Sequence, residues 1–418
     1  MGRHSRPARR VAPMALLLAV LLLAQACALD RPVAPRSTPL PHRRPPPSPS
    51  CVDRTFAGLS EAQRLGQLFL VGQTGPDPVA TGVAAAVQDG HVAGVVLGGS
   101  GWSGAATVRS NVQRLQSLAT PEATGGVRLL VSGNQEGGAP GSLQAFYGPG
   151  FSAIPSALVQ GTMDPARLRR DAATWGAELR AAGVNLDLAP VMDTVPTPLV
   201  ATNAPIGALD REYGHDPATV AAHGSAFVRG MESAGVAATV KHFPGLGRVG
   251  GNTDFSPRVV DTVTTRHDPY LDPFRAGIAA GAGFVMVSLA IYARLDAANP
   301  AVFSPVVIQQ LLRGDLGFQG VVMSDDLGAA AAVQDVPAAE RALRFLDAGG
   351  DLILTMRPAD VGPMEGAVRS RMDSDPSFRD RVNASVRRVL AAKASLGLLP
   401  ACAPVDTATA PTSPASPA

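Results

Sequence analysis

Short apolar segments alternate with longer segments of helical periodicity along most of this chain, and this alternation narrows the choice of fold more than any other feature. The apolar segments are rich in β-branched residues and lie at 67–71, 94–97, 127–132, 184–188, 237–242, 283–289, 320–324 and 351–355. Helical periodicity is clearest at 165–182, 217–234, 304–313 and 337–348. Eight such β–α units predict an α/β fold, a single-domain (β/α)₈ TIM barrel, with a doubly wound open sheet as the alternative.

The first 26 residues predict an export signal. Four arginines precede an apolar stretch at 14–23, and small residues lead to Cys27. The stretch is shorter than the roughly 20 residues that a membrane-spanning helix needs. Cys27 stands where exported bacterial lipoproteins carry their lipid, so we expect lipid attachment there, with cleavage and plain secretion as the alternative.

Composition divides the rest of the chain. Residues 27–50 are rich in Pro and Arg and predict an extended tether, whereas residues 403–418 are mostly Ala, Pro, Thr and Ser and predict a disordered tail. The barrel should therefore occupy residues 51–402, with Cys51 and Cys402 at its two ends. Because export permits disulfides, we predict that these cysteines pair, with two free thiols as the alternative.

Charge and motif spacing argue against several kinds of partner. The chain has 36 basic and 34 acidic residues, but its first 50 residues hold eight arginines and one Asp, so the remainder is slightly acidic. A nucleic-acid groove would show as a basic stripe, and we expect no nucleic-acid partner. No Cys and His cluster has metal-ligand spacing and no Gly-rich phosphate loop follows the first strand, so we expect neither a metal nor a cofactor.

Polar residues gather at the carboxyl ends of the predicted strands, where a barrel builds its active site. In chain order they are Asn134, Gln135, Glu136, Asp187, Asp193, Lys241, His242, Ser288, Asp325 and Asp326. Packing alone predicts Gly, Asn or Ser at strand ends, so this clustering favours catalysis. Only Lys241 and Lys393 are lysines among the 36 basic residues, which indicates a specific role for Lys241.

Each of these candidates also has a plainer interpretation. Of Asp325 and Asp326, we expect one to face the cavity as a nucleophile or cation stabiliser and the other to cap a helix. Lys241 can donate to sugar hydroxyls or phosphates, form a Schiff base, or lie in a buried ion pair. His242 alone would more often be a hydrogen-bonded core residue, and Arg211 an ordinary surface charge.

Six segments carry a resemblance to a known family. They are 134–138 (NQEGG), 148–157 (GPGFSAIPSA), 185–193 (NLDLAPVMD), 210–214 (DREYG), 241–245 (KHFPG) and 324–327 (SDDL). Together they resemble glycoside hydrolase family 3, in its single-domain β-N-acetylhexosaminidase branch of exported bacterial lipoproteins. The resemblance extends over roughly residues 55–400.

The resemblance implies a retaining glycoside hydrolase that removes terminal β-linked N-acetylglucosamine from cell-wall or extracellular glycans. It places the nucleophile at Asp325. The implied sugar-binding residues are Asn134, Arg211, Lys241 and His242. The implied partners are the glycan substrate and, through the lipid on Cys27, a membrane.

The chain departs from the family pattern in four places. Asn134 replaces an Asp, Ala145 replaces an Arg, and Leu246 replaces a His. The mobile loop of the family carries Asp-Ser-His, whose His is the acid/base, and this chain has Asn-Thr-Asp at 252–254. The family's imidazole acid/base is therefore missing from its usual position.

Asp254 is the candidate acid/base in place of that His, because a carboxylic acid can transfer the same proton when a closed loop buries it near Asp325. Two alternatives stay open. The first is a catalytically impaired glycan-binding lipoprotein on the same barrel, which Asn134, Ala145 and the missing acid/base His favour. The second is an aldolase-like barrel that uses Lys241 as a Schiff base.

Overall fold

The structure is a computed structural model that describes residues 50–99 and 101–402. The predicted export signal, the Cys27 lipid site, the tether as far as residue 49 and the tail at 403–418 lie outside the described residues. Within the described ranges, no helix is both long and apolar enough to cross a bilayer.

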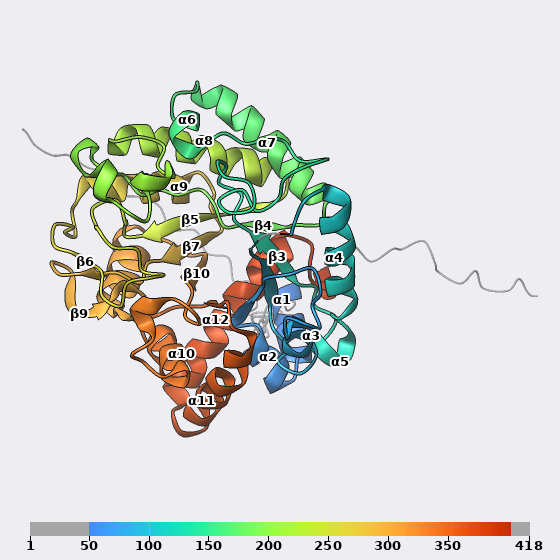
Figure 1. The fold of residues 1–418 in the computed structure, drawn as a ribbon. Coiled ribbons are helices and arrows are strands. Elements are labelled where there is room, and N and C mark those ends of the chain that lie inside the picture. Colours follow the sequence, from blue (N-terminus) through green and yellow to red (C-terminus); the bar gives the residue numbers. More distant parts are fainter. Residues whose placement is uncertain (1–49, 100, 403–418) are drawn as a thin grey trace, which may run out of the picture. The chain divides into compact units, whose positions relative to one another are not determined.

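Eight parallel strands form the centre of the fold (Figure 1). They are β1 (Phe69–Gln73), β2 (Gly94–Leu97), β3 (Leu130–Gly133), β4 (Leu186–Asp187), β5 (Ala237–Phe243), β7 (Phe284–Val287), β10 (Val321–Ser324) and β11 (Ile353–Thr355). Their order in the sheet is β10-β7-β5-β4-β3-β2-β1-β11, and the end strands also meet, because Met323 bridges Leu352. The Ser324 N–H donates to the Leu352 carbonyl oxygen at 3.0 Å. The sheet is therefore closed, which confirms the predicted barrel over the open sheet.

The strands follow the predicted order but are mostly shorter than the apolar segments that predicted them. β4 has two residues because side chains replace ladder hydrogen bonds around it. Asn185 Oδ1 accepts the Val131 N–H at 2.9 Å, and Asp187 Oδ1 accepts the Gln135 N–H at 3.0 Å. A separate small sheet was not predicted. Its strands are too short to show an alternation of apolar and polar residues. They are β6 (Val260–Asp261), β8 (Ile291–Tyr292) and β9 (Asp296–Pro300).

Helices surround the barrel and begin where the sequence signals place them. α7 (Pro165–Ala181) and α8 (Pro217–Ser233) each start with Pro after an Asp whose carboxylate accepts a first-turn N–H. The segment at 337–348 forms α10 (Ala338–Asp347), and the segment at 304–313 forms a π-helix, Val306–Asp315. The other α-helices are α1 (Cys51–Gly58), α2 (Glu61–Gly66), α3 (Val83–Gln88), α4 (Ala105–Ser117), α5 (Pro121–Thr124), α6 (Ala157–Gln160), α9 (Asp272–Ala279), α11 (Val361–Ser374) and α12 (Pro376–Ser395). Short 3₁₀ helices lie at Thr197–Thr202, Gly207–Leu209, Pro269–Leu271, Ala301–Phe303, Ala331–Val333, Pro358–Asp360 and Pro400–Cys402.

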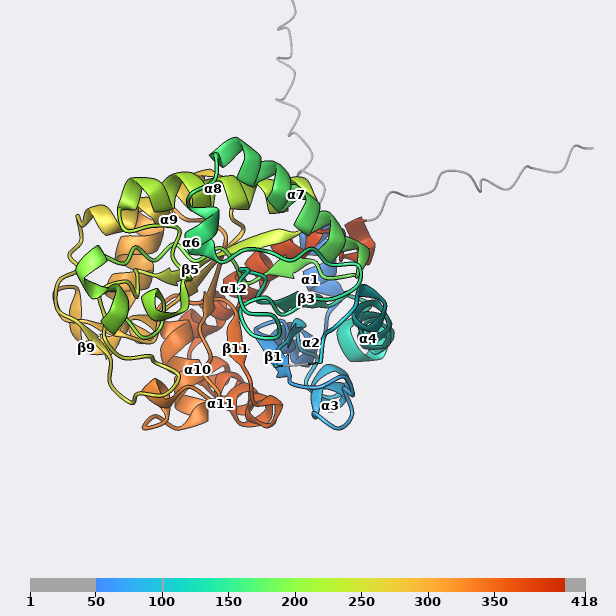
Figure 2. The same ribbon diagram turned by 45° about the horizontal axis from the view of Figure 1, so that its top comes forward.

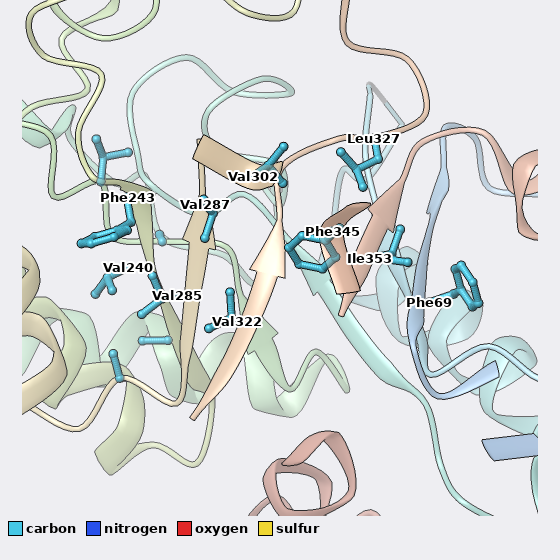
Figure 3. Close-up of a cluster of buried hydrophobic side chains, with 14 of the residues drawn as sticks. Phe69, Val240, Phe243, Val285, Val287, Val302, Val322, Leu327, Phe345 and Ile353 are labelled. Carbon is cyan, nitrogen blue, oxygen red and sulfur yellow. The ribbon is translucent and has the colours of Figure 1, made fainter. Parts of the chain in front are cut away.

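Strand side chains alternate between two buried clusters, as the period of two requires. In β7, Phe284 and Met286 belong to the cluster inside the barrel. Val285 and Val287 belong to the larger cluster between the strands and the helices, part of which is drawn in Figure 3. Val389 of α12 joins the inner cluster, so this helix closes the barrel interior at one end.

The two ends of the described chain meet at the amino end of the barrel. Cys51 and Cys402 form a disulfide with their Cα atoms 5.1 Å apart. α1 packs beside α12 (Figure 2). Lys393 of α12 is buried at this end and donates to Gln67 Oε1 at 2.7 Å, and burial lowers the pKa of this lysine well below its ordinary value. The second lysine of the chain therefore lies far from the carboxyl ends of the strands.

Candidate active site

A cavity of about 450 Å³ opens at the carboxyl ends of the strands. All six residues that the sequence placed in the site line it: Asn134, Arg211, Lys241, His242, Asp254 and Asp325. Part of its wall is apolar and comes from Val96, Leu188, Met286, Leu354 and Met356. A cavity of this size, with apolar walls and a few convergent polar groups, suits a small ligand such as one sugar ring.

Glu136 anchors the two cations of the cavity. Its carboxylate accepts two hydrogen bonds from Arg211, from Nε and from one terminal nitrogen, both at 2.8 Å. Lys241 Nζ lies 2.6 Å from the same carboxylate. Burial alone would raise the pKa of Glu136, but the charges of Arg211 and Lys241 outweigh it and hold that pKa well below its ordinary value. Glu136 is therefore a fixed anion that sets the positions of both cations.

Lys241 is in a buried ion pair and also faces the cavity, so both interpretations of this residue hold. Its Nζ donates to Asn134 Oδ1 at 3.1 Å as well as to Glu136. An ammonium group has three N–H donors, so one remains for a ligand. A Schiff base requires an amine that is free to attack a carbonyl carbon, whereas Lys241 Nζ is bound by Glu136 and Asn134, which argues against the aldolase-like alternative.

His242 is held by a buried carboxylate behind it. Its Nδ1 lies 2.7 Å from Asp193 Oδ2. Asp193 Oδ1 also accepts the backbone N–H of Leu246, at 2.8 Å. With Nδ1 bound to Asp193, the ring leaves Nε2 for a ligand in the cavity.

Asp325 and Asp326 have separate roles, as expected, but the prediction that one of them caps a helix is wrong, because a turn and not a helix follows Asp326. The Asp326 carboxylate accepts the backbone N–H groups of Gly328, Ala329 and Met356 at 2.8–3.1 Å, so it stabilises the turn after β10. Asp325 accepts only the Asp326 N–H, at 2.9 Å, and no cation of the described residues forms an ion pair with it. Burial raises the pKa of Asp325, and the nearby Asp254 carboxylate raises it further, against the opposing charge of His242.

The loop that carries Asp254 is held against the segment that follows the Asp325 turn. The Ala331 N–H donates to the Asp254 carbonyl oxygen and the Ala332 N–H to the Thr253 carbonyl oxygen, both at 3.1 Å. The Asp254 side chain lines the cavity and is exposed in this structure, and its burial beneath a closed loop stays a prediction. The exposure of Asp254 has a local cause. Asn252 Oδ1 accepts the Asp254 N–H, and the resulting turn places the Thr253 side chain inward and the Asp254 side chain outward.

Comparison with known proteins identifies the family. Residues 62–392 match the model of the glycosyl hydrolase family 3 N-terminal domain. The chain belongs to glycosyl hydrolase family 3. A β-hexosaminidase of Stenotrophomonas maltophilia (strain K279a) is 41% identical over 253 residues, which cover 58% of this chain and 71% of that protein. A β-hexosaminidase of Xylella fastidiosa (strain M23) is 39% identical over 294 residues, which cover 68% of this chain and 82% of that protein.

A solved structure agrees with this assignment. The crystal structure of a β-N-acetylhexosaminidase from Beutenbergia cavernae DSM 12333 is 48% identical in sequence and matches with a TM-score of 0.77. The match covers 80% of this chain and 98% of that one. The predicted family, the barrel and a hexosaminidase-like glycosidase are therefore confirmed.

The departures from the family 3 pattern lie in or directly behind the cavity. Asn134 and Ala145 both line it, and the Ala145 N–H donates to the Asn134 carbonyl oxygen at 2.7 Å. Leu246 is buried, and its backbone N–H donates to the carboxylate that holds His242. These substitutions therefore change the site of this glycosidase and not a remote surface.

Sequence reasoning left three residues of the family 3 site without a role. Glu136 and Asp193 lie inside two of the quoted motifs, next to residues that were chosen, so motif membership was the available signal. Phe255 lines the cavity mouth with 82% of its surface exposed, and no sequence signal distinguished it.

Among residues 50–99 and 101–402, no group of three or more His, Cys, Asp or Glu side chains could hold a metal ion.

Proposed function

We propose that this family 3 glycosidase removes terminal β-linked N-acetylglucosamine by a retaining mechanism with Asp325 as the nucleophile. One observation carries the proposal: Asp325 faces the cavity without an ion-pair partner, while the other polar groups there are chiefly cations and neutral donors. Such an anion can attack a sugar carbon and stabilise the positive charge that develops on it. The similar proteins from S. maltophilia and B. cavernae are named hexosaminidases, which supports an N-acetylhexosamine as the sugar.

The reaction has two halves. In the first, Asp325 attacks the anomeric carbon, the bond from that carbon to the leaving oxygen breaks, and Asp254 gives this oxygen its proton. In the second, Asp254 takes a proton from water, whose oxygen attacks the anomeric carbon and releases the Asp325 carboxylate. The position of Asp254 at the cavity mouth suits both exchange with water and contact with the leaving group.

The sugar would be held by donors that the protein has already oriented. Glu136 fixes Lys241 and Arg211, and Asp193 fixes His242, so little rearrangement is needed when hydroxyl groups bind. The free donors of these three side chains can bind sugar oxygens without neutralising the nucleophile.

A second candidate function is glycan binding with impaired catalysis. The exposed position of Asp254 and the missing family His favour it, because a water-exposed carboxyl group is a poorer general acid than a positioned imidazole. The two candidates share the sugar site and differ in turnover.

The natural substrate depends on where the protein is located, and the support for that location is the sequence of its first 27 residues. We propose that the chain is exported, cleaved before Cys27 and anchored through a lipid on that residue. An anchored enzyme of this type would meet cell-wall or other extracellular glycans.

The test is hydrolysis of an aryl β-N-acetylglucosaminide by the wild type and by Asp325→Asn. We expect the wild type to release the aryl group, and Asp325→Asn to lower kcat/KM by roughly 10³-fold or more. Asp326→Ala is the matched control; it should lose about 1 kcal/mol of stability and less than about tenfold in rate. A fluoro-sugar inhibitor that labelled another residue, or an Asp325→Asn variant that kept its rate, would contradict the assignment.

A further inference from the structure

A second groove, of about 710 Å³, lies at the amino end of the barrel, opposite the active site. It runs between α4 and the last turn of α7, beside the residues that precede β3 and β4 and those that follow α12. Three arginines line it: Arg109, Arg128 and Arg180. No acidic side chain is among its lining residues.

These arginines are exposed and keep donors free for a ligand. Arg109 Nε donates to the Ala181 carbonyl oxygen at 3.0 Å, and one terminal nitrogen of Arg180 donates to the Gly235 carbonyl oxygen at 2.8 Å. These two bonds hold the guanidinium groups in place without neutralising their charge. None of the three arginines forms an ion pair with a carboxylate of the described residues.

One other face of the barrel, formed by α11 and α12, pairs all of its arginines. Every arginine of α11 and α12 has a carboxylate partner; they are Arg369, Arg371, Arg379, Arg381, Arg387 and Arg388. The chain beyond residue 50 is slightly acidic overall, whereas the lining of this groove has three arginines and no acidic side chain, so the groove is more basic than the chain around it.

The groove is connected through the C-terminal residues of the barrel to the disulfide at its amino end. Leu398 lines the groove, and its carbonyl oxygen accepts the Arg128 N–H at 3.0 Å. Four residues later, Cys402 is bonded to Cys51, directly after the segment 27–50. That segment itself carries four arginines and one acidic residue. The groove and the first described residues are therefore both at the amino end of the barrel.

We propose that this groove binds the phosphate headgroups of an anionic membrane and so turns the active site away from the membrane, toward its glycan. Guanidinium groups bind phosphate oxygens through paired N–H donors. Each arginine near an anionic membrane surface raises the affinity of the protein for that membrane about fivefold, so three arginines together raise it roughly 100-fold. The proposal goes beyond the glycosidase reaction. It rests on the proposed export of the chain and does not depend on catalysis.

The test measures vesicle binding without any lipid on the protein. A chain that begins at residue 27 and carries Cys27→Ser keeps the whole barrel, since the fold begins at Cys51. It is sedimented with vesicles of phosphatidylcholine alone or mixed with phosphatidylglycerol. We expect binding to the mixed vesicles only, weakened by salt, and a roughly 100-fold loss of affinity in the triple variant Arg109→Gln, Arg128→Gln, Arg180→Gln.

A matched control removes the same charge elsewhere. Arg229, Arg258 and Arg294 are exposed, form no ion pair with the described residues and lie outside the groove. Their triple Gln variant should bind the mixed vesicles nearly as well as the parent chain. Both variants should hydrolyse the aryl substrate at the parent rate, which shows that they fold. Because vesicle binding needs no turnover, its failure is distinguishable from failure of the glycosidase proposal.

Three outcomes would overturn the proposal. The parent chain could bind neither kind of vesicle. The two triple variants could lose affinity equally, which would assign the attraction to net charge. Soluble glycerol phosphate or polyphosphate could release the parent chain from the mixed vesicles at constant ionic strength, which would identify a site for a free phosphate or a soluble polyanion in place of a membrane.

Discussion

Replacing Glu136 by Gln should destabilise the barrel and weaken the site together. The substitution keeps the size of the side chain, but one of the two carboxylate oxygens becomes an NH₂ group. The carboxylate accepts two hydrogen bonds from Arg211 and contacts Lys241 Nζ, so at least one of these donors would then face another donor. Both cations are largely buried, with side-chain exposures of 12% for Arg211 and 2% for Lys241. Removing one partner of a buried pair costs about 3–5 kcal/mol.

The assay is denaturant and thermal unfolding at neutral pH. We expect a loss of about 3–5 kcal/mol, or roughly 5–10 °C in Tm. Since the pKa of Glu136 is lowered, its contribution is present above the ordinary value of 4.5 and is lost as pH falls below it, so the difference between the two proteins should shrink in acid.

Glu340→Gln is the control for this substitution. Glu340 pairs with Arg344 at 2.7 Å on an exposed helix face, and both side chains are nearly half exposed. Removing this pair should cost less than about 1 kcal/mol. A Glu136→Gln loss as small as the control's, with unchanged KM, would refute the reasoning that this carboxylate organises the two cations.

Two further predictions concern other parts of the barrel. Burial raises the pKa of Asp187 from 3.8 to about 7, so between these two pH values the folded protein keeps a proton that the unfolded chain releases. The contribution of Asp187 to stability is therefore fully present in acid and is lost as pH rises through about 7. Asp187→Asn keeps the acceptor for the Gln135 N–H, and it should therefore gain stability relative to the wild type between about pH 4 and pH 7, by at most about 4 kcal/mol in unfolding titrations. The double variant Cys51→Ser, Cys402→Ser should lose about 2–4 kcal/mol, and reductant should lower the Tm of the wild type but not of the variant.

The barrel and the polar rim were predictable because both depend on patterns that each strand carries by itself. An apolar segment of four to seven residues, repeated eight times, indicates the sheet, and the carboxyl ends of parallel strands meet at one face whatever the loops do. That is why Asn134, Lys241 and Asp325 could be placed together from sequence, although 191 positions of the chain separate the first from the last.

The contacts between loops were not predictable in the same way. The role of Glu136 depends on Arg211, which is 75 residues away and lies in an irregular loop. The position of the loop that carries Asp254 depends on backbone hydrogen bonds from Ala331 and Ala332, and backbone groups carry no sequence pattern. The small β6-β8-β9 sheet has strands too short to alternate visibly. In each case the contact joins segments that are distant in sequence, and the groups that make it are of types found in every protein.

The most direct test of the account compares Asp254→Ala on two substrates, because the proposed reaction needs this residue only where a leaving group must be protonated. On an N-acetylglucosaminyl disaccharide, a poor leaving group, the variant should lose about 10²–10⁴-fold in kcat/KM. On an activated aryl N-acetylglucosaminide it should lose far less, and azide should restore part of that rate. Asp335→Ala, at an exposed Asp outside the cavity, should change neither rate. Equal losses on both substrates without azide rescue would contradict the account and favour a glycan-binding protein.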